Sequence, residues 1–171
     1  MTFQILPARI QDAEDIATLA NSAYRGDSGR QGWTTEADLL DGNRTDAAAL
    51  EDIIRKPGTL ILKCVEEGQL LGCMELRKDN HKLYLGLLTV RPQQQGKGIG
   101  KTLLKAAEAE AKKQNCSSIY MTVISVRRDL IDWYVRHGFV ETGERKPFDL
   151  STQRFGRPRT ELEFVVLEKV M

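Results

Sequence analysis

The sequence predicts a mixed α/β fold, with a mostly antiparallel sheet and helices packed on its faces. Three observations support this class. Residues 59–90 contain three strand-like runs separated by turn residues, which is typical of an antiparallel meander. Residues 98–114 repeat apolar side chains at helical spacing. Further strand-like runs flank these regions, so we expect a central sheet of about seven strands.

At the N-terminal end, residues 3–8 form a short apolar run that predicts the first strand. A helix follows, because apolar residues then recur every three or four positions as far as Tyr24. Asp12 precedes this periodic stretch, and its carboxylate is suited to accept a hydrogen bond from the first helical turn. We therefore predict Asp12 as the N-cap.

Residues 25–58 predict a variable, irregular segment with short helices. Thr35-x-x-Asp38 and Thr45-Asp46 resemble helix starts, and Pro57-Gly58 is a stop signal.

The rest of the chain alternates between strands and helices. Glu67-Gly68 and the turn at residues 79–81 separate the three strands of the meander. After the helix at 98–114, residues 117–125 alternate like a buried strand, and 129–138 predict a short helix that Gly138 ends. Two closing strands are expected, at residues 139–144 and 160–170.

Length, charge and cysteine content limit the classes of protein. With 171 residues, the chain is expected to form one domain covering 1–171. Its 25 basic and 24 acidic residues give no electrostatic argument for binding nucleic acid or an anionic membrane. There is no leader-like segment and no run of about 18 apolar residues, so we expect a cytoplasmic protein.

Two further residue classes argue against metal or disulfide chemistry. The three cysteines, Cys64, Cys73 and Cys116, lie in apolar stretches and predict buried free thiols in a reducing compartment. No His, Cys or acidic residues have metal-ligand spacing, so no metal is expected.

A glycine-rich turn, QQGKGIGKT at residues 94–102, lies between the third meander strand and the long helix. It ends like a phosphate loop, but that pattern needs a glycine five residues before Gly100, where this chain has Gln95. The dinucleotide fingerprint also fails, because Lys101 stands where its third glycine belongs. A strand, open glycine backbone and a helix N-terminus together still form a general anion-binding device, so we expect a phosphate ligand unless this is an ordinary tight turn.

Two motifs resemble the GNAT superfamily of N-acetyltransferases. The first is Gln95-x-x-Gly98-x-Gly100, which is similar to the acetyl-CoA-binding signature of that family and likewise follows a strand and opens a helix. The second is Tyr134-x-x-x-Gly138-Phe139, on the later short helix. The element order over residues 3–168 also matches the family. The resemblance therefore implies a GNAT fold, whose sheet is splayed at the CoA site.

The resemblance also implies roles for individual residues. Leu88, Thr89 and Val90 would bind the pantetheine arm of acetyl-CoA and supply a backbone N–H to the acetyl carbonyl. The pyrophosphate would be held by the backbone of the turn residues Gln95, Gly96, Lys97, Gly98, Ile99, Gly100 and Lys101. Tyr134 matches the position that donates a proton to the departing CoA thiolate, although a core-facing aromatic is the alternative.

The general base departs from the commonest family pattern. Many relatives carry a glutamate on the strand before the CoA turn, and this chain has Gly86 at that position. Glu75, an acid within an otherwise apolar strand, is our first candidate to deprotonate the acceptor amine, with a solvated strand glutamate as the alternative. Glu36 and Glu163 are weaker candidates.

The resemblance implies direct transfer of acetyl from acetyl-CoA to a primary amine of a small molecule or a peptide in a ternary complex. In the family, the segment after the first helix and the last strands choose the acceptor. Here residues 26–56 are acidic around Trp33, whereas residues 145–159 are basic. The acidic stretch favours a cationic amine, whereas the basic stretch favours an acceptor that carries a carboxylate or phosphate. Both stretches are equally consistent with solvated loops. A silent acyl-CoA-binding domain is the alternative function, and a homodimer is a further expectation from the resemblance.

Overall fold

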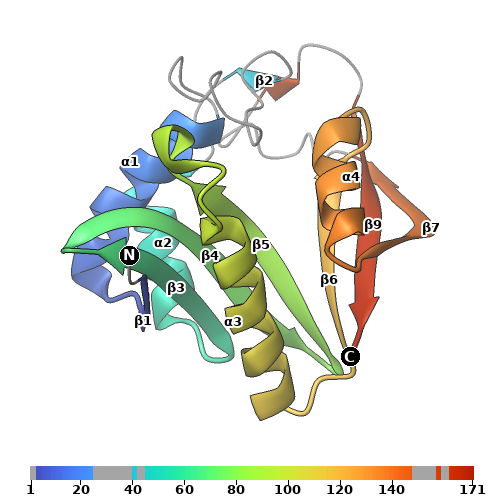
Figure 1. Ribbon diagram of the computed structural model, residues 1–171, viewed down its shortest axis with the longest axis horizontal. Helices are drawn as coiled ribbons and strands as arrows, with labels where there is room; N and C mark the ends of the chain where they lie inside the picture. Colours follow the sequence, from blue (N-terminus) through green and yellow to red (C-terminus); the bar gives the residue numbers. More distant parts are fainter. Residues whose placement is uncertain (1–2, 25–39, 42–44, 148–156, 159–161) are drawn as a thin grey trace.

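The computed structural model describes residues 3–24, 40–41, 45–147, 157–158 and 162–171. Its main feature is a seven-stranded sheet with helices on both faces (Figure 1). In order across the sheet, the strands are β1 (Gln4–Pro7), β3 (Thr59–Glu66), β4 (Gln69–Asp79), β5 (Lys82–Val90), β6 (Ser118–Ile124), β9 (Glu163–Val170) and β7 (Val140–Pro147). The β5–β6 pair is parallel and the other pairs are antiparallel, which confirms the predicted mixed sheet.

The helices form two layers. A short 3₁₀ turn, η1 (Ile10–Asp12), leads into α1 (Ala13–Tyr24), and α1 packs with α2 (Ala47–Arg55) against one face through a cluster that includes Ile16, Leu50 and Ile61. The other face carries α3 (Ile99–Lys113) and α4 (Arg128–Arg136), joined to the sheet by the larger core cluster (Figure 1). None of the described helices is both long and apolar enough to span a membrane.

The predicted helix starts had different outcomes. Asp46 is the N-cap of α2, because its side chain accepts a hydrogen bond from the Ala49 N–H at 2.8 Å. Asp12, however, is not the N-cap of α1. It is the last residue of η1, and its carboxylate accepts a hydrogen bond from the Arg9 N–H at 2.8 Å. The carboxylate therefore stabilises the 3₁₀ turn before α1 and does not cap α1 itself. The Thr35-x-x-Asp38 signal lies outside the described residues.

An irregularity in β5 opens the sheet. Cys73 pairs with Thr89 and Glu75 pairs with Gly86, so β5 contains one more residue than β4 between these pairs. Leu87 absorbs this bulge with a left-handed φ of 54°, an unusual conformation for a residue with a branched side chain. Pairing of β5 with β6 covers only Lys82 to Tyr84, and beyond Tyr84↔Tyr120 the two strands diverge (Figure 1).

The three cysteines are buried free thiols, as predicted. They do not share one environment: Cys73 belongs to the cluster under α1 and α2, while Cys64 and Cys116 belong to the core on the α3 face. Burial, together with the negative charge of Glu66, raises the pKa of the Cys64 thiol to about 11. The thiol form of Cys64 is therefore strongly favoured at neutral pH.

Candidate active site

The glycine turn connects β5 to α3 through a second 3₁₀ turn, η3 (Pro92–Gln94). Gly96 and Gly98 have φ values of 87° and 83°, and Gly98 is the N-cap of α3. A β-carbon at either position would meet no atom within 4 Å, so the backbone conformation requires glycine while the space above the turn stays open. As at any helix N-terminus, the first N–H groups of α3 have no partner inside the helix and point toward its N-terminal end, where the turn lies. The turn is therefore suited to bind an anion such as a pyrophosphate.

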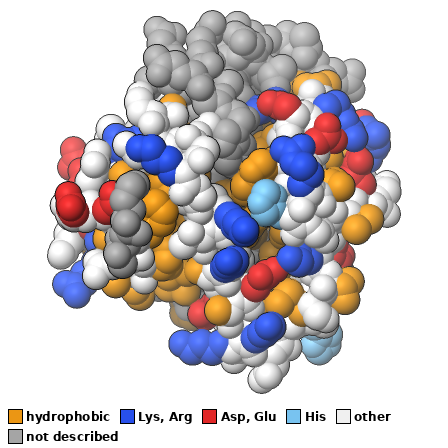
Figure 2. Space-filling view, in the orientation of Figure 1, with side chains coloured by type: hydrophobic (Ala, Val, Ile, Leu, Met, Phe, Trp, Pro, Cys, Tyr) orange, Lys and Arg blue, Asp and Glu red, His pale blue; other side chains and the backbone are white. Residues whose placement is uncertain are grey.

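A cavity of about 210 Å³ adjoins this turn. It brings together most of the predicted turn residues with one residue of α4 and the C-cap of that helix, neither of which was expected at the site. The lining is Val90, Gln95, Gly96, Gly98, Ile99, Gly100, Lys101, Trp133 and His137. Figure 2 shows a hollow in the middle of this face with basic side chains around it. The cavity thus combines open backbone with positive charge.

The two turn lysines differ. Lys101 lines the cavity, whereas Lys97 is exposed and its ammonium donates to the Gln94 side-chain oxygen at 2.9 Å. Gln95 has a structural contact, since its amide donates to the Val90 carbonyl at 3.2 Å and so ties the turn back to the end of β5. Of the predicted turn residues, Lys97 is the one that does not line the cavity.

Trp133 and His137 close the cavity from the side of α4. Their rings lie 4.2 Å apart, and the His137 Nδ1 is 2.7 Å from the Trp133 carbonyl oxygen. Neither was expected at the site from the sequence. The available signal was their i, i+4 spacing on the helix that carries Tyr134, which places them on one helix face.

The predicted pantetheine segment follows the Leu87 bulge. Leu88 and Val90 contribute to the core on the α3 face, whereas Thr89 is fully buried and its hydroxyl donates to the Leu87 carbonyl at 2.9 Å. These three residues occupy the part of β5 that has diverged from β6, so they form one edge of the opening in the sheet.

Tyr134 and Glu75 lie on opposite faces of the sheet. Tyr134 is only 4% exposed and contacts Trp133 and Phe139 edge-on, with centroid distances of 5.1 and 5.7 Å, within the core that includes Leu88. Glu75 is half-buried on β4 and pairs with Ile61, whose side chain packs under α1 and α2. The sheet therefore lies between the two predicted catalytic residues.

Gly86, where many relatives carry a glutamate, lies under the ring of Tyr84. A β-carbon at position 86 would come within 2.7 Å of the Tyr84 hydroxyl oxygen. The Arg77 guanidinium stacks 4.6 Å from the Tyr84 ring centroid. The ring centroids of Tyr84 and of Tyr120, on β6, are 5.5 Å apart. Tyr84 was not expected at the site from the sequence, although its position two residues before Gly86 places both on the same strand face.

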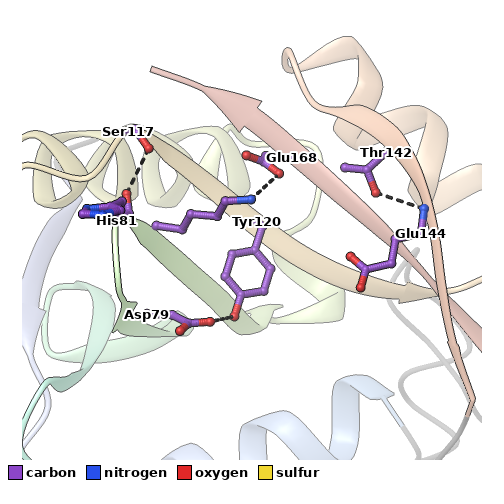
Figure 3. A network of polar contacts seen from close by, with 8 residues as sticks. Asp79, His81, Ser117, Tyr120, Thr142, Glu144 and Glu168 are labelled. Carbon is purple, nitrogen blue, oxygen red and sulfur yellow. Dashed lines mark hydrogen bonds and ion pairs between the residues drawn. The ribbon is translucent and has the colours of Figure 1, made fainter.

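A polar network lies farther along the same face (Figure 3). The Tyr120 hydroxyl donates to Asp79 Oδ2 at 2.6 Å, and Lys82 forms an ion pair with Glu168 at 3.0 Å. Burial and the Asp79 carboxylate raise the pKa of Tyr120 to about 12, with Arg77 acting in the opposite direction. The adjoining cavity of about 320 Å³ is lined by Asp79, Asn80, His81, Lys82, Tyr120, Glu144, Lys146, Val166 and Glu168. Tyr120 is thus protonated and tied to Asp79 at neutral pH.

The weaker base candidates are less suitable or cannot be placed. Glu163 pairs with Arg145 at the start of β9 and is 45% exposed, and Glu36 lies outside the described residues. A two-residue ribbon, β2 (Leu40–Asp41) with β8 (Arg157–Pro158), joins the two regions expected to select the acceptor. Across the described ranges, no group of three or more His, Cys, Asp or Glu side chains could hold a metal ion.

Comparison with known proteins identifies the family of this fold. The family model described as the acetyltransferase (GNAT) domain matches residues 34–151. A curated relative, acetyltransferase Atu2258 from Agrobacterium fabrum, is 37% identical over 65 residues, which cover 38% of this chain and 46% of the relative. The match thus spans less than half of that relative's length.

Solved structures show the same fold. The PaiA N-acetyltransferase from Thermoplasma acidophilum, in complex with coenzyme A, is 21% identical with a TM-score of 0.70, and the match covers 100% of both chains. An N-acetyltransferase from Staphylococcus aureus Mu50 is 16% identical with a TM-score of 0.75, covering 99% of this chain and 98% of that one. Since the family model also covers more than half of the sequence, the chain belongs to the GNAT acetyltransferase domain family.

Proposed function

We propose that this protein is an N-acetyltransferase that transfers acetyl from acetyl-CoA to a primary amine of a small molecule or a peptide. The observation that carries this proposal is the divergence of β5 from β6 beyond Tyr84↔Tyr120, which opens the sheet beside the glycine turn. An opening between strands can hold an extended substrate arm, and the turn at its end suits the pyrophosphate. One structural neighbour was solved with coenzyme A, which supports the same ligand here.

The turn and the opening would bind different parts of acetyl-CoA. The backbone N–H groups around Gly96, Gly98 and Gly100 would hold the pyrophosphate, and the Lys101 ammonium would add positive charge. The pantetheine arm would extend along Leu88, Thr89 and Val90, on the diverged part of β5. This arrangement would place the thioester near the Leu87 bulge.

The chemistry requires two proton transfers on opposite sides of the thioester. An acceptor ammonium first loses a proton, for which the half-buried Glu75 carboxylate is the candidate base. The amine then attacks the acetyl carbonyl, and a backbone N–H from the 88–90 segment would stabilise the oxyanion. When the C–S bond breaks, Tyr134 would donate a proton to the CoA thiolate. The separation of Glu75 and Tyr134 by the sheet suits these two roles.

A thiol-release assay tests the proposal. The protein is incubated with acetyl-CoA and, separately, with spermidine, lysine, kanamycin and a short peptide with a free N-terminus. We expect at least one amine to stimulate release of free CoA well above the rate with acetyl-CoA alone. Binding of CoA is measured in parallel by calorimetry.

A silent acyl-CoA-binding domain is the second candidate, and Gly86 is the observation that favours it, since a carboxylate is absent from that position. The two functions give different results in the same assay. Tight CoA binding with no amine-stimulated thiol release across the whole panel would support the silent domain and contradict the transferase.

A further inference from the structure

We propose that the Tyr84 hydroxyl positions the acceptor amine for attack on the thioester. This hydroxyl lies in the space that a side chain at position 86 would otherwise fill. This inference rests on the proposed acetyltransferase function. It assigns an acceptor-binding role to a residue that neither the motifs nor the comparisons point to.

The geometry around Gly86 shows where the Tyr84 side chain lies. A β-carbon at position 86 would come within 2.7 Å of Tyr84 Oη, 2.8 Å of Cε2 and 2.9 Å of Cζ. These distances are shorter than van der Waals contact, so the phenol end of Tyr84 occupies the space beside Gly86. The side chain leans along β5 toward the Leu87 bulge, and its hydroxyl lies where β5 begins to leave β6.

Neighbouring side chains hold the ring in this position. Arg77, Tyr84 and Tyr120 are directly opposite one another on β4, β5 and β6, so their side chains share one face of the sheet. The Arg77 guanidinium stacks on the Tyr84 ring, and the Tyr120 ring packs against it at 5.5 Å. Tyr120 is itself anchored by its hydrogen bond to Asp79. Because the ring is held on two sides, the Tyr84 side chain loses little conformational entropy when its hydroxyl binds a ligand.

The location suits contact with an acceptor. Tyr84 is half-buried as a residue, so it is not enclosed in the core as Leu83 and Leu85 beside it are. Glu75 lies opposite Gly86 on the neighbouring strand, and opposite residues of an antiparallel pair project to the same face. The side chains of Tyr84 and Glu75 therefore project from adjacent strands to the same side of the sheet, the side that faces α1 and α2.

A phenol oxygen can accept a hydrogen bond from an amine N–H. In this role Tyr84 would hold one N–H of the acceptor while Glu75 takes the departing proton, which leaves the nitrogen lone pair directed at the acetyl carbonyl. Positioning of this kind accelerates attack because the reacting atoms are already aligned. Tyr84 itself gains and loses no proton in this step.

The Tyr84→Phe variant tests the role, because it keeps the ring between Arg77 and Tyr120 and removes only the hydroxyl. The acceptor is whichever of spermidine, lysine, kanamycin or the peptide the wild-type protein acetylates fastest. We expect kcat/KM for that amine to fall about tenfold, as for one lost hydrogen bond, with the KM for acetyl-CoA unchanged. Thr18→Val is the control, since it removes an exposed side-chain hydroxyl on α1 that donates to the Glu14 carbonyl at 3.0 Å, and it should keep its activity within about twofold.

A second variant separates positioning from packing. Gly86→Ala adds a methyl group that displaces the Tyr84 phenol, so it should cause a similar loss although the hydroxyl is still present. Once Tyr84→Phe has removed the hydroxyl, Gly86→Ala should add little further loss, so the two changes should not be additive in a double-mutant cycle. Melting temperatures of all variants show whether the fold is kept.

The outcomes distinguish this inference from the proposed function. An active wild-type protein whose Tyr84→Phe variant has normal kcat/KM, or in which the two substitutions are additive, overturns the inference and leaves the acetyltransferase proposal standing. A wild-type protein that binds CoA but acetylates no amine overturns both.

Discussion

Glu75 lies directly opposite Gly86 in the β4–β5 ladder, so a carboxylate is present on the neighbouring strand beside the position where the family resemblance leads us to expect a glutamate. Opposite residues in an antiparallel pair have β-carbons about 4.5–5.5 Å apart and project to the same face. A carboxylate on β4 therefore reaches a similar region of the sheet face as one on β5. This relationship makes Glu75 the leading candidate for the base.

Glu75→Gln should lower kcat/KM for the acceptor by about 100-fold at neutral pH, a typical contribution of a general base. The loss should shrink as the pH approaches the pKa of the acceptor ammonium, about 10 for an alkyl ammonium. More of the acceptor is then already the free amine and needs no base. The measurement is a pH profile of thiol release. Glu67→Gln, in the β3–β4 turn, is the control, and equal losses at every pH would argue against a base role for Glu75.

Tyr134→Phe should lower kcat by about 100-fold, because the CoA thiolate would leave without a proton donor. Affinity for CoA should change little, since the ring still packs between Trp133 and Phe139. Steady-state kinetics and calorimetry together check this. Unchanged turnover at all pH values would remove Tyr134 from the mechanism.

Gly98→Ala should weaken CoA binding. Its φ of 83° is unfavourable for a residue with a β-carbon by about 1–2 kcal/mol, so the first turn of α3 would shift and its N–H groups would no longer align on the pyrophosphate. Loss of one such charge-assisted hydrogen bond corresponds to about a tenfold weaker Kd.

Gly143→Ala is the matched control for this change. Gly143 has a similar φ of 89°, is exposed on β7 and has open space around its Cα. It should lose comparable stability while binding CoA as the wild-type protein does. If both variants bind CoA equally, the glycine turn is not the pyrophosphate site.

Stability at high pH should depend on Tyr120. Its pKa in the folded protein is about 12, raised by burial and by Asp79, against about 10 when unfolded. Tyr120 is protonated in both states below pH 10, so its contribution is fully present there. Between pH 10 and 12 the unfolded chain releases this proton first, which favours unfolding.

Denaturant titrations at several pH values measure this effect. The free energy of unfolding should fall more steeply between pH 10 and 12 for the wild-type protein than for Tyr120→Phe. Parallel curves for the two proteins would contradict the assigned pKa.

The cysteines should resist thiol reagents in the folded protein. Cys64 is fully buried and its pKa is about 11, so at pH 8 its thiolate is more than about 100-fold scarcer than that of an ordinary cysteine. Labelling with an aromatic disulfide reagent should therefore be slow until guanidinium is added. Rapid reaction of the native protein would show that the thiols are accessible, and it would also raise the background of the thiol-release assay.

Sequence reasoning predicted features that depend on nearby residues. The amphipathic pattern of α3, the turns of the β3–β4–β5 meander and the glycine turn all follow from side chains a few positions apart. Asp12 shows that even a local signal can be misread. Residue preferences did not predict the 3₁₀ turn before α1, and the Asp12 carboxylate accepts its hydrogen bond within that turn.

By itself, the sequence determined the mixed α/β class, the order of the main elements and a glycine-rich turn whose motif resembles the GNAT family. Only the tertiary structure decided where β5 leaves β6, that Trp133 and His137 line the cavity beside the turn, and that Tyr84 lies over Gly86 between Arg77 and Tyr120. The reason is physical: periodicity assigns a side chain to a face, but its neighbours depend on strand order, register and bulges, which bring residues such as Tyr84 and Tyr120 together across 36 positions of the chain.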